Sequence, residues 1–236
     1  ILFDAGYSGA FIENAERMRL DLSQVTDIAL SHGHIDHTGG LPAFFERFMQ
    51  PVRLYAHPYA FLPKRFEGLD AGTPLPLSDL PKWVEPHLSG KPKRISEHVT
   101  ILGEIPRVYA FEEGRAVGET VSDCGCCWES DRLRDDTSLA LSVPGGVFVV
   151  TGCAHSGVCS AVAAARREEK ESRVPGVLGG FHLFETGDEL KQTLSELKAL
   201  GVERVYPAHC TSLAVKAALL GAFDTREVGV GLTLEW

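Results

Sequence analysis

The chain has 236 residues, of which 44% are hydrophobic, and a formal net charge of −9 at pH 7. A chain of this length can bury a full core and fits one α/β domain, or one domain with a large insertion. The acidic balance and the lack of any basic run argue against a nucleic-acid partner. No apolar stretch reaches the roughly 18 residues that a bilayer-spanning helix needs, so we expect no membrane partner either.

Strands and helices alternate over the first part of the chain. The apolar runs and turn residues predict a strand at 1–6, a helix at 9–18, a strand at 25–32, a helix at 41–49 and a strand at 52–57. The chain opens on ILFDAG, which has the character of a strand interior and carries no initiator Met. We therefore expect an N-terminal piece, strands included, to be missing from this sequence.

The segment 58–135 has a different composition. It holds most of the thirteen prolines, scattered charges and one strand-like stretch at 98–102. This composition predicts an irregular insertion that forms a lid over a site. Its aromatic rings could stack on a planar ligand and its cations could contact a phosphate. The aromatic candidates are Tyr59, Phe61, Phe66, Trp83, Tyr109, Phe111 and Trp128, and the basic candidates are Lys64, Arg65, Lys82, Lys91, Lys93 and Arg94.

Regular structure returns at residue 136. The predicted elements are a hairpin of 137–143 and 147–152, a helix near 157–170, a strand at 174–180, a helix near 187–200, a strand at 204–209, a helix at 212–221 and a closing strand at 228–236.

Six cysteines are present, at positions 124, 126, 127, 153, 159 and 210. A chain of this size does not need disulfide staples, so we expect free thiols in a reducing cytoplasm. The run DCGCCW offers ligands for a soft metal, but a loop of ordinary thiols is the favoured interpretation. Cys153, two residues before a histidine, could be a thiol nucleophile, but a structural role is favoured.

Four of the predicted strands are each followed directly by one or more histidines. LSHGHIDHTGG, at 30–40, crowds three histidines and an aspartate at one strand end, and three further strands are each followed by one histidine. In α/β folds the loops beyond strand carboxyl ends gather ligands, so these imidazoles would converge if the strands are neighbours. A lone histidine at a strand end is more often a cap or a core residue. Taken by itself, His182 is therefore a weaker candidate for a metal ligand. The cluster favours a metal site, because nitrogen and carboxylate ligands suit Zn²⁺, with Fe or Mn as alternatives.

These segments resemble the metallo-β-lactamase-fold hydrolase superfamily. The resemblance rests on SHGHIDHTGG, with LFDAG as an early Asp-Gly turn. More narrowly, TGCAHSGV, GGFHL and YPAHCT resemble the branch named 7,8-dihydropterin-6-methyl-4-(β-D-ribofuranosyl)aminobenzene-5′-phosphate synthase. The resemblance implies a single α/β domain over 1–236, built as a four-layer αβ/βα sandwich with 58–135 as the lid, and a dinuclear metal site at one edge.

The resemblance also implies a ligand set. It assigns one ion to His32, His34 and His155, and a second ion to Asp36, His37 and His209. Many superfamily members place a bridging Asp where this chain has His182 in GGFHL. A neutral imidazole cannot bridge two cations, so His182 either caps the second metal or orients substrate, and we expect one or two zinc ions. Asp4 is expected to orient a ligating imidazole from outside the ligand set, with Asp136, or its neighbour Asp135, as the alternative.

Three functions stay open at this point. The leading one is a hydrolase of a small phosphoester, lactone or ester, in which a metal-activated hydroxide attacks and Asp36 and His182 take part in catalysis. The second is a synthase that joins a pterin to a ribosyl-aminobenzene phosphate on the same metals. The third is a metal-binding protein with little catalysis. The expected partner is a small molecule, phosphate-bearing or pterin-like, and a homo-oligomer is left open.

Overall fold

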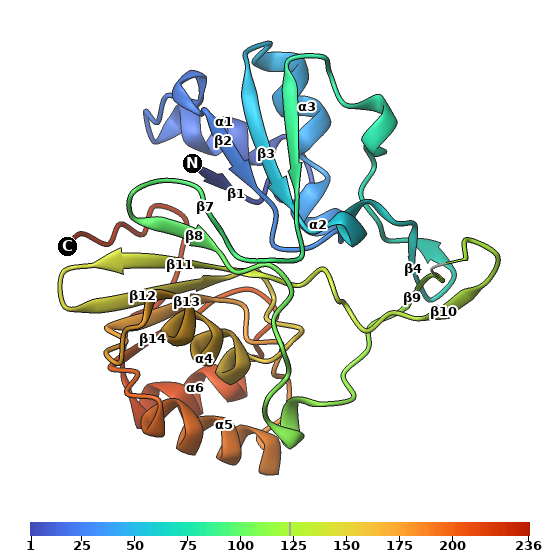
Figure 1. Cartoon of the computed structure of the whole chain (residues 1–236). Helices are drawn as coiled ribbons and strands as arrows, with labels where there is room; N and C mark the ends of the chain where they lie inside the picture. Colours follow the sequence, from blue (N-terminus) through green and yellow to red (C-terminus); the bar gives the residue numbers. More distant parts are fainter. Residues whose placement is uncertain (123) are drawn as a thin grey trace. The chain divides into compact units, whose positions relative to one another are not determined.

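The computed structural model describes residues 1–122 and 124–236 (Figure 1). They form two compact units: unit 1 comprises Ile1–Gly90 and Ala116–Asp135, and unit 2 comprises Lys91–Arg115 and Asp136–Trp236. The segment 58–135 is therefore divided, because its middle part belongs to unit 2 and its two ends belong to unit 1. Its role as a lid stays a prediction.

The main sheet of unit 1 is parallel throughout. Its order is β1-β2-β3-β6. The strands are β1 (Leu2–Phe3), β2 (Asp27–Ala29), β3 (Val52–Ala56) and β6 (Val84–Leu88). Strand β2 is buried along its whole length, as expected for a central strand of a parallel sheet with both faces covered. The loop that leaves the carboxyl end of β2 carries the histidine cluster.

Helices pack against this sheet. The helices of unit 1 are α1 (Ala10–Arg17), α2 (Ile35–Thr38) and α3 (Leu41–Arg47), with short 3₁₀ turns η1 (Leu22–Gln24), η2 (Pro58–Phe61) and η3 (Leu77–Asp79). Ile12 of α1 and Phe44 of α3 share one core cluster with Ile28 and Leu54 of the sheet. Pro42 stands in the first turn of α3, where its missing N–H has no helical partner to lose.

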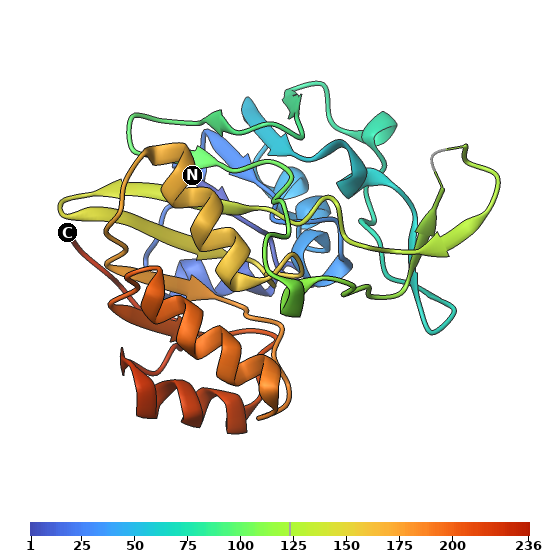
Figure 2. The same cartoon turned by 60° about the horizontal axis from the view of Figure 1, so that its bottom comes forward.

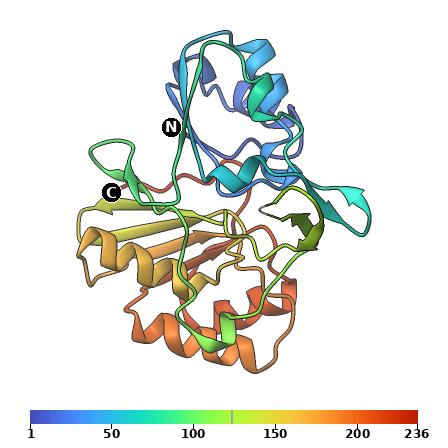
Figure 3. The ribbon, with the colours of Figure 1, turned by 45° about the vertical axis from the view of Figure 1, so that its right-hand side comes forward.

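A small antiparallel sheet completes unit 1 (Figure 3). Its order is β10-β9-β4-β5, with strands β4 (Lys64–Phe66), β5 (Leu69–Asp70), β9 (Glu119–Val121) and β10 (Trp128–Ser130). The hairpin of β9 and β10 carries the cysteine cluster, and Cys124 and Cys126 are joined by a disulfide. The prediction of ordinary thiols in this loop is therefore wrong for that pair.

Unit 2 is built on one mixed sheet of order β15-β14-β13-β12-β11-β8-β7. Its strands are β7 (Lys93–Arg94), β8 (Val99–Ile101), β11 (Ser138–Val143), β12 (Gly146–Thr151), β13 (Gly176–Gly179), β14 (Arg204–Pro207) and β15 (Asp224–Thr225). The predicted hairpin is confirmed as the antiparallel pair β11 and β12. Strands β12, β13 and β14 run parallel, so the loops after them lie at one edge of the sheet.

The helices of unit 2 are α4 (Val158–Glu169), α5 (Asp188–Ala199) and α6 (Leu213–Ala222), preceded by the turn η4 (Ala110–Glu112). All three helices lie on one face of the sheet (Figures 1 and 2). Their apolar faces and the sheet enclose a buried core that includes Val162, Val177, Leu197 and Leu219.

The α/β fold class predicted from the sequence is confirmed, and two local predictions are wrong. Residues 228–236, all of which the structure describes, form no strand, because Gly231 adopts φ +94° in a turn and interrupts the alternation. The ring of Trp236 instead packs 4.8 Å, centroid to centroid, from Phe148. The segment 58–135 is also more regular than predicted, since it supplies β6 to the main sheet and all of the small sheet. Among the described residues, the structure has no helix that is long and apolar enough to cross a membrane.

Candidate metal centre

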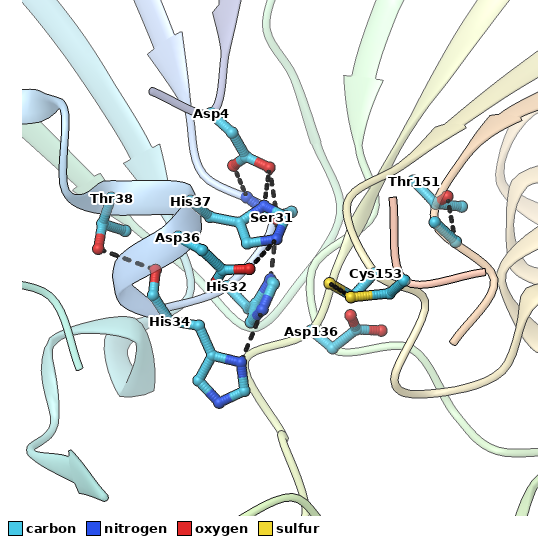
Figure 4. Close-up of polar contacts among 12 residues, drawn as sticks. Asp4, Ser31, His32, His34, Asp36, His37, Thr38, Asp136, Thr151 and Cys153 are labelled. Carbon is cyan, nitrogen blue, oxygen red and sulfur yellow. Dashed lines mark hydrogen bonds and ion pairs between the residues drawn. The ribbon is translucent and has the colours of Figure 1, made fainter. Parts of the chain in front are cut away.

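Asp4 organises the histidine loop of unit 1 (Figure 4). It follows β1 with φ +60°, and its N–H donates to Ala29 O at 2.9 Å. One carboxylate oxygen, Oδ1, accepts the N–H of Ser31 at 2.7 Å. The other, Oδ2, accepts the hydroxyl of Ser31 at 2.7 Å and lies 2.6 Å from His37 Nδ1. This carboxylate therefore joins the end of β1 to the whole loop that leaves β2.

These contacts fix which ring nitrogens carry protons. An ionised carboxylate only accepts, so His37 Nδ1 must be the donor, which leaves a lone pair on its Nε2. The Ser31 hydroxyl has one proton and donates it to Asp4. At 2.9 Å from His32 Nδ1 it must accept, so His32 also carries its proton on Nδ1 and a lone pair on Nε2. Both rings are thus held in a tautomer that metal-ligating imidazoles adopt.

The donor atoms have the spacing that a zinc-class ion requires. His32 Nε2 and His34 Nδ1 are 3.1 Å apart. Two nitrogens bound at about 2.0–2.1 Å to one tetrahedral zinc are about 3.3 Å apart. Burial lowers the pKa of His34, and the charge of Lys64 lowers it further, which favours the neutral, ligating form. A second donor pair is formed by Asp36 Oδ2 and His37 Nε2, 3.6 Å apart. The residues present in unit 1 therefore fit the metal that the sequence predicts.

A buried ion-pair network holds the backbone between the first two histidines. Gly33 N–H donates to Asp135 Oδ2 at 2.8 Å, and a Cβ at Gly33 would stand 2.1 Å from Ala60 O. Lys64 Nζ is 3.0 Å from Asp135 Oδ1 and 2.7 Å from Asp131 Oδ2. Burial opposes the charge of Lys64, but the two carboxylates outweigh it and raise its pKa. Lys64, predicted as a phosphate contact, is instead committed to these aspartates.

A cavity of about 320 Å³ in unit 1 adjoins this network. Asp135 and Lys64 line it, together with Tyr59, Arg134 and residues of β9 and β10. The Arg134 guanidinium carbon lies 4.6 Å from the centroid of the Tyr59 ring, and its Nη1 donates to Tyr59 Oη at 3.2 Å. Tyr59 is among the predicted aromatic contacts. Arg134 was missed, because it stands in the polar run before β11 and no local pattern marks it.

In unit 2, Asp136 holds the loop after β12. Its buried carboxylate accepts the backbone N–H of His155 at 3.1 Å and of Ser156 at 2.9 Å. The residue before them, Ala154, has φ +56°, which a non-glycine residue adopts only when its surroundings impose it. Asp136 thus fixes the backbone from which the His155 side chain projects, which is how it could play the predicted orienting role.

Two of the predicted histidines of unit 2 have rings that lie next to each other, tilted. The rings of His155 and His182 are 4.4 Å apart, centroid to centroid, at an interplanar angle of 53°. His182 follows β13 with φ +47°, and burial lowers its pKa, which favours the neutral form. His209 follows β14 and is exposed. The structure thus pairs His155 with His182 and places all three histidines in loops at one edge of the sheet.

A cysteine pair lies in the same loops. Cys153 Sγ is 3.4 Å from Cys210 Sγ (Figure 4, where Cys153 is labelled). Hydrogen bonds from Cys153 and His209 outweigh burial and lower the pKa of Cys210 well below its usual range. The sequence drew attention to Cys153 alone. Cys210 directly follows His209, and that adjacency was the available signal.

Known proteins resemble this chain in sequence and in structure. The family profile described as the metallo-beta-lactamase superfamily matches residues 1–112. A curated protein of Methanocaldococcus jannaschii, 7,8-dihydropterin-6-methyl-4-(beta-D-ribofuranosyl)-aminobenzene-5′-phosphate synthase, is 30% identical over 247 residues, with coverage of 94% of this chain and 79% of that protein.

Solved structures match nearly the whole chain. A crystal structure described as a metal-dependent hydrolase of the β-lactamase superfamily superposes with a TM-score of 0.85 at 26% identity, with coverage of 99% of this chain and 88% of the other. The Zn²⁺-bound PqqB of Methylobacterium extorquens superposes with a TM-score of 0.55 at 12% identity, with coverage of 99% and 82%. The second likeness concerns the fold alone.

Proposed function

We propose that this chain, which belongs to the metallo-β-lactamase superfamily, is a metal-dependent hydrolase of a small phosphoester, lactone or ester. Its metallo-β-lactamase fold, predicted from the histidine motif, is confirmed by the TM-score of 0.85 to a superfamily member. The observation that carries the proposal is the hydrogen-bonded set of Asp4, Ser31, His32 and His37. A partly buried carboxylate that fixes two imidazole tautomers is the arrangement that metal ligands need.

The ligand assignment is part of the proposal. One zinc ion would be held by His32, His34 and His155, and a second by Asp36, His37 and His209. A zinc-class ion supplies, when bound, a water whose pKa is lowered to about 7. Asp36, a half-buried carboxylate beside His37, would accept the proton that this water loses. His182 would orient the substrate or cap the second ion.

The substrate would enter from the cavity beside Asp135. Tyr59 gives this cavity an aromatic wall, and Arg134 gives it a guanidinium that can contact a carboxylate or a phosphate in a bidentate way. A small molecule with a planar ring and an anionic group fits this lining. Arg134→Ala would then raise KM for an anionic ester more than for a neutral one.

Metal content and turnover of the same samples test the proposal. Zinc per chain is measured by mass spectrometry on the full chain purified without added metal, and a panel of chromogenic phosphodiesters, lactones and esters is assayed. His32→Ala and His37→Ala should each lose metal and at least about 100-fold in kcat. His98→Ala, an exposed histidine away from the loops, is the matched control. Turnover that survives chelation and both substitutions would contradict the proposal.

A synthase is the second candidate, favoured by the curated relative of that name, which aligns with 94% of this chain. A synthase must join two substrates and release a product that contains both. Incubation with a 7,8-dihydropterin that carries a leaving group on its 6-methyl carbon and with a ribosyl-aminobenzene phosphate, followed by product mass analysis, separates the two candidates. A coupled product without ester turnover favours the synthase, and ester turnover without coupling favours the hydrolase.

A further inference from the structure

The hairpin loop between β9 and β10 carries three exposed cysteines: Cys124, Cys126 and Cys127. The backbone of the loop is closed by two hydrogen bonds, from Ser122 N–H to Cys127 O at 2.9 Å and from Gly125 N–H to Ser122 O at 2.7 Å. Gly125 adopts φ +70°, so the tight turn between two cysteines depends on a glycine. Nothing in the proposed hydrolysis uses these sulfurs.

The sulfur atoms are arranged for exchange. Cys124 and Cys126 form a disulfide, and the free thiol of Cys127 has its Sγ 4.0 Å from Cys126 Sγ. Ser122 Oγ lies 3.2 Å from Cys124 Sγ and 3.1 Å from Cys127 Sγ. A hydroxyl in this position can donate to whichever of those sulfurs becomes a thiolate. It would stabilise both an attacking thiolate at Cys127 and a leaving thiolate at Cys124.

The disulfide adds little as a staple. It closes a loop of three residues, and the chain entropy removed by a crosslink is smallest for short loops. The strands on either side are already paired in register, Trp128 with Val121 and Ser130 with Glu119. Exposed disulfides are the labile kind, in contrast to buried structural ones. The position and exposure of this disulfide therefore favour a role in thiol–disulfide exchange over a role in stabilising the fold.

We propose that this loop is a thiol–disulfide exchange site for small thiols and disulfides. A thiolate RS⁻ attacks Sγ of Cys124 or Cys126, the S–S bond breaks, an RS–S bond forms, and the other cysteine leaves as a thiolate that takes up a proton. A second RSH displaces the first group as RSSR and leaves the second cysteine reduced. The net reaction converts one protein disulfide and two RSH into two protein thiols and one RSSR, and it runs in reverse with RSSR as the oxidant.

Cys127 adds an intramolecular route. Its thiolate can attack Sγ of Cys126 in a mixed disulfide there: the bond to the small thiol breaks, a Cys126–Cys127 disulfide forms, and the small thiol leaves as RS⁻ without a second molecule of RSH. The three sulfurs also lie within 4.8 Å of one another, a spacing that would suit a soft cation such as Zn²⁺ or Cu⁺. The disulfide favours exchange, and metal binding is an outcome that the test detects.

The test uses the full chain in glutathione buffers that run from fully reduced to fully oxidised. Samples are quenched with acid, alkylated and mapped by peptide mass spectrometry. The expected result is that Cys124 and Cys126 lose alkylation together across the series. Glutathione should be trapped on Cys126 in Cys124→Ser/Cys127→Ser, and on Cys124 in Cys126→Ser/Cys127→Ser. Cys159→Ser, which removes a buried thiol elsewhere, is the matched control and should leave the midpoint unchanged.

Three results would overturn the proposal. One is a pair that stays reduced in the most oxidising buffer, and another is a pair that stays oxidised in the most reducing buffer. The third is protection of all three thiols by one equivalent of Zn²⁺ or Cu⁺, with that equivalent lost in the triple serine variant, which would make the loop a metal site. Ester turnover should be the same in the triple serine variant and the wild type. The exchange site and the hydrolase activity can therefore be tested independently of each other.

Discussion

His37 Nδ1 lies 2.6 Å from Asp4 Oδ2, and the same carboxylate accepts both the N–H and the hydroxyl of Ser31. One aspartate at the end of β1 thereby sets the ring orientation of His37 directly and that of His32 through a serine. Asp4 itself contributes no atom to the predicted ligand set.

Asp4→Asn should weaken zinc binding. An amide places an N–H₂ or a neutral oxygen where the loop requires a charged acceptor, so the His37 tautomer is no longer fixed. Loss of such an orienting partner typically lowers metal affinity by about 10–100-fold. Competition with a chromophoric chelator measures the effect. Asp70→Asn, an exposed aspartate of the same unit, is the control, and equal affinities in the two variants would contradict the prediction.

Lys64→Met should destabilise unit 1 by about 3–5 kcal/mol, because it leaves two buried carboxylates without their cation. Lys64 is 3% exposed and bridges Asp131 and Asp135. Urea unfolding measures the loss, with the exposed Lys82→Met as control. If Asp131→Asn restores part of the stability to Lys64→Met, the cost arises from uncompensated charge. A loss in the free energy of unfolding below about 1 kcal/mol would show that the ion pairs contribute little to stability.

Gly157→Ala should be strongly destabilising, by about 2–4 kcal/mol. Gly157 precedes α4 with φ +99°, and an added Cβ would stand 2.0 Å from Glu112 Cδ. The Glu112 carboxylate accepts the N–H groups of Cys159 and Ser160, so the methyl group would displace the cap of α4. Thermal unfolding measures the change. Gly187→Ala, where an added Cβ meets open space, is the control and should stay within about 0.5 kcal/mol of the wild type.

Glu169 should make unit 2 sensitive to acid. Burial raises its pKa, but hydrogen bonds from Thr100, Ser142 and Arg94 together outweigh burial and lower the pKa below 4.5. The carboxylate therefore stabilises the fold above the unfolded-state value near 4.5, and this contribution is lost as the pH falls through the lower folded-state pKa.

Comparison with Glu169→Gln tests that dependence. The variant should lose about 1–3 kcal/mol at pH 7 and show a flatter acid limb between pH 5 and pH 3, because its amide does not titrate. Urea unfolding across that range gives the curve. Glu168→Gln, at an exposed position of α4 next to Glu169, is the control. Parallel curves for Glu169→Gln and the wild type would mean that Glu169 does not carry this dependence.

His182→Asp should raise the metal content of the chain. The resemblance to the superfamily implies a bridging aspartate at this place, and a carboxylate can contact two cations where a neutral imidazole cannot. Purified without added metal, the wild type is expected to hold fewer equivalents of zinc than His182→Asp. His182→Asn, which has the same shape without the charge, is the control. Equal zinc content in all three proteins would contradict the prediction that a carboxylate at position 182 increases metal binding.

Features that depend on a few neighbouring residues could be predicted from the sequence. Apolar periodicity predicted the positions of several elements close to their observed bounds: β2, β3, the β11–β12 hairpin and helices α3 to α6. This is possible because the periodicity of a strand or a helix is visible within about ten residues. Composition within six residues was also enough to predict a metal site at the histidine cluster and to indicate the superfamily.

The partners of the histidine loop depend on how distant parts of the chain fold together. Asp4 meets His37 across 33 positions, and Asp135 meets Gly33 across 102. Each contact follows from strand pairing and loop packing, which no local pattern specifies. Lys64 looked like a solvent-exposed cation in the sequence, and its environment of two buried carboxylates became visible only in the folded chain. The chemistry of a side chain is set by its residue type, but its charge state and orientation are set by neighbours that folding brings from distant parts of the chain.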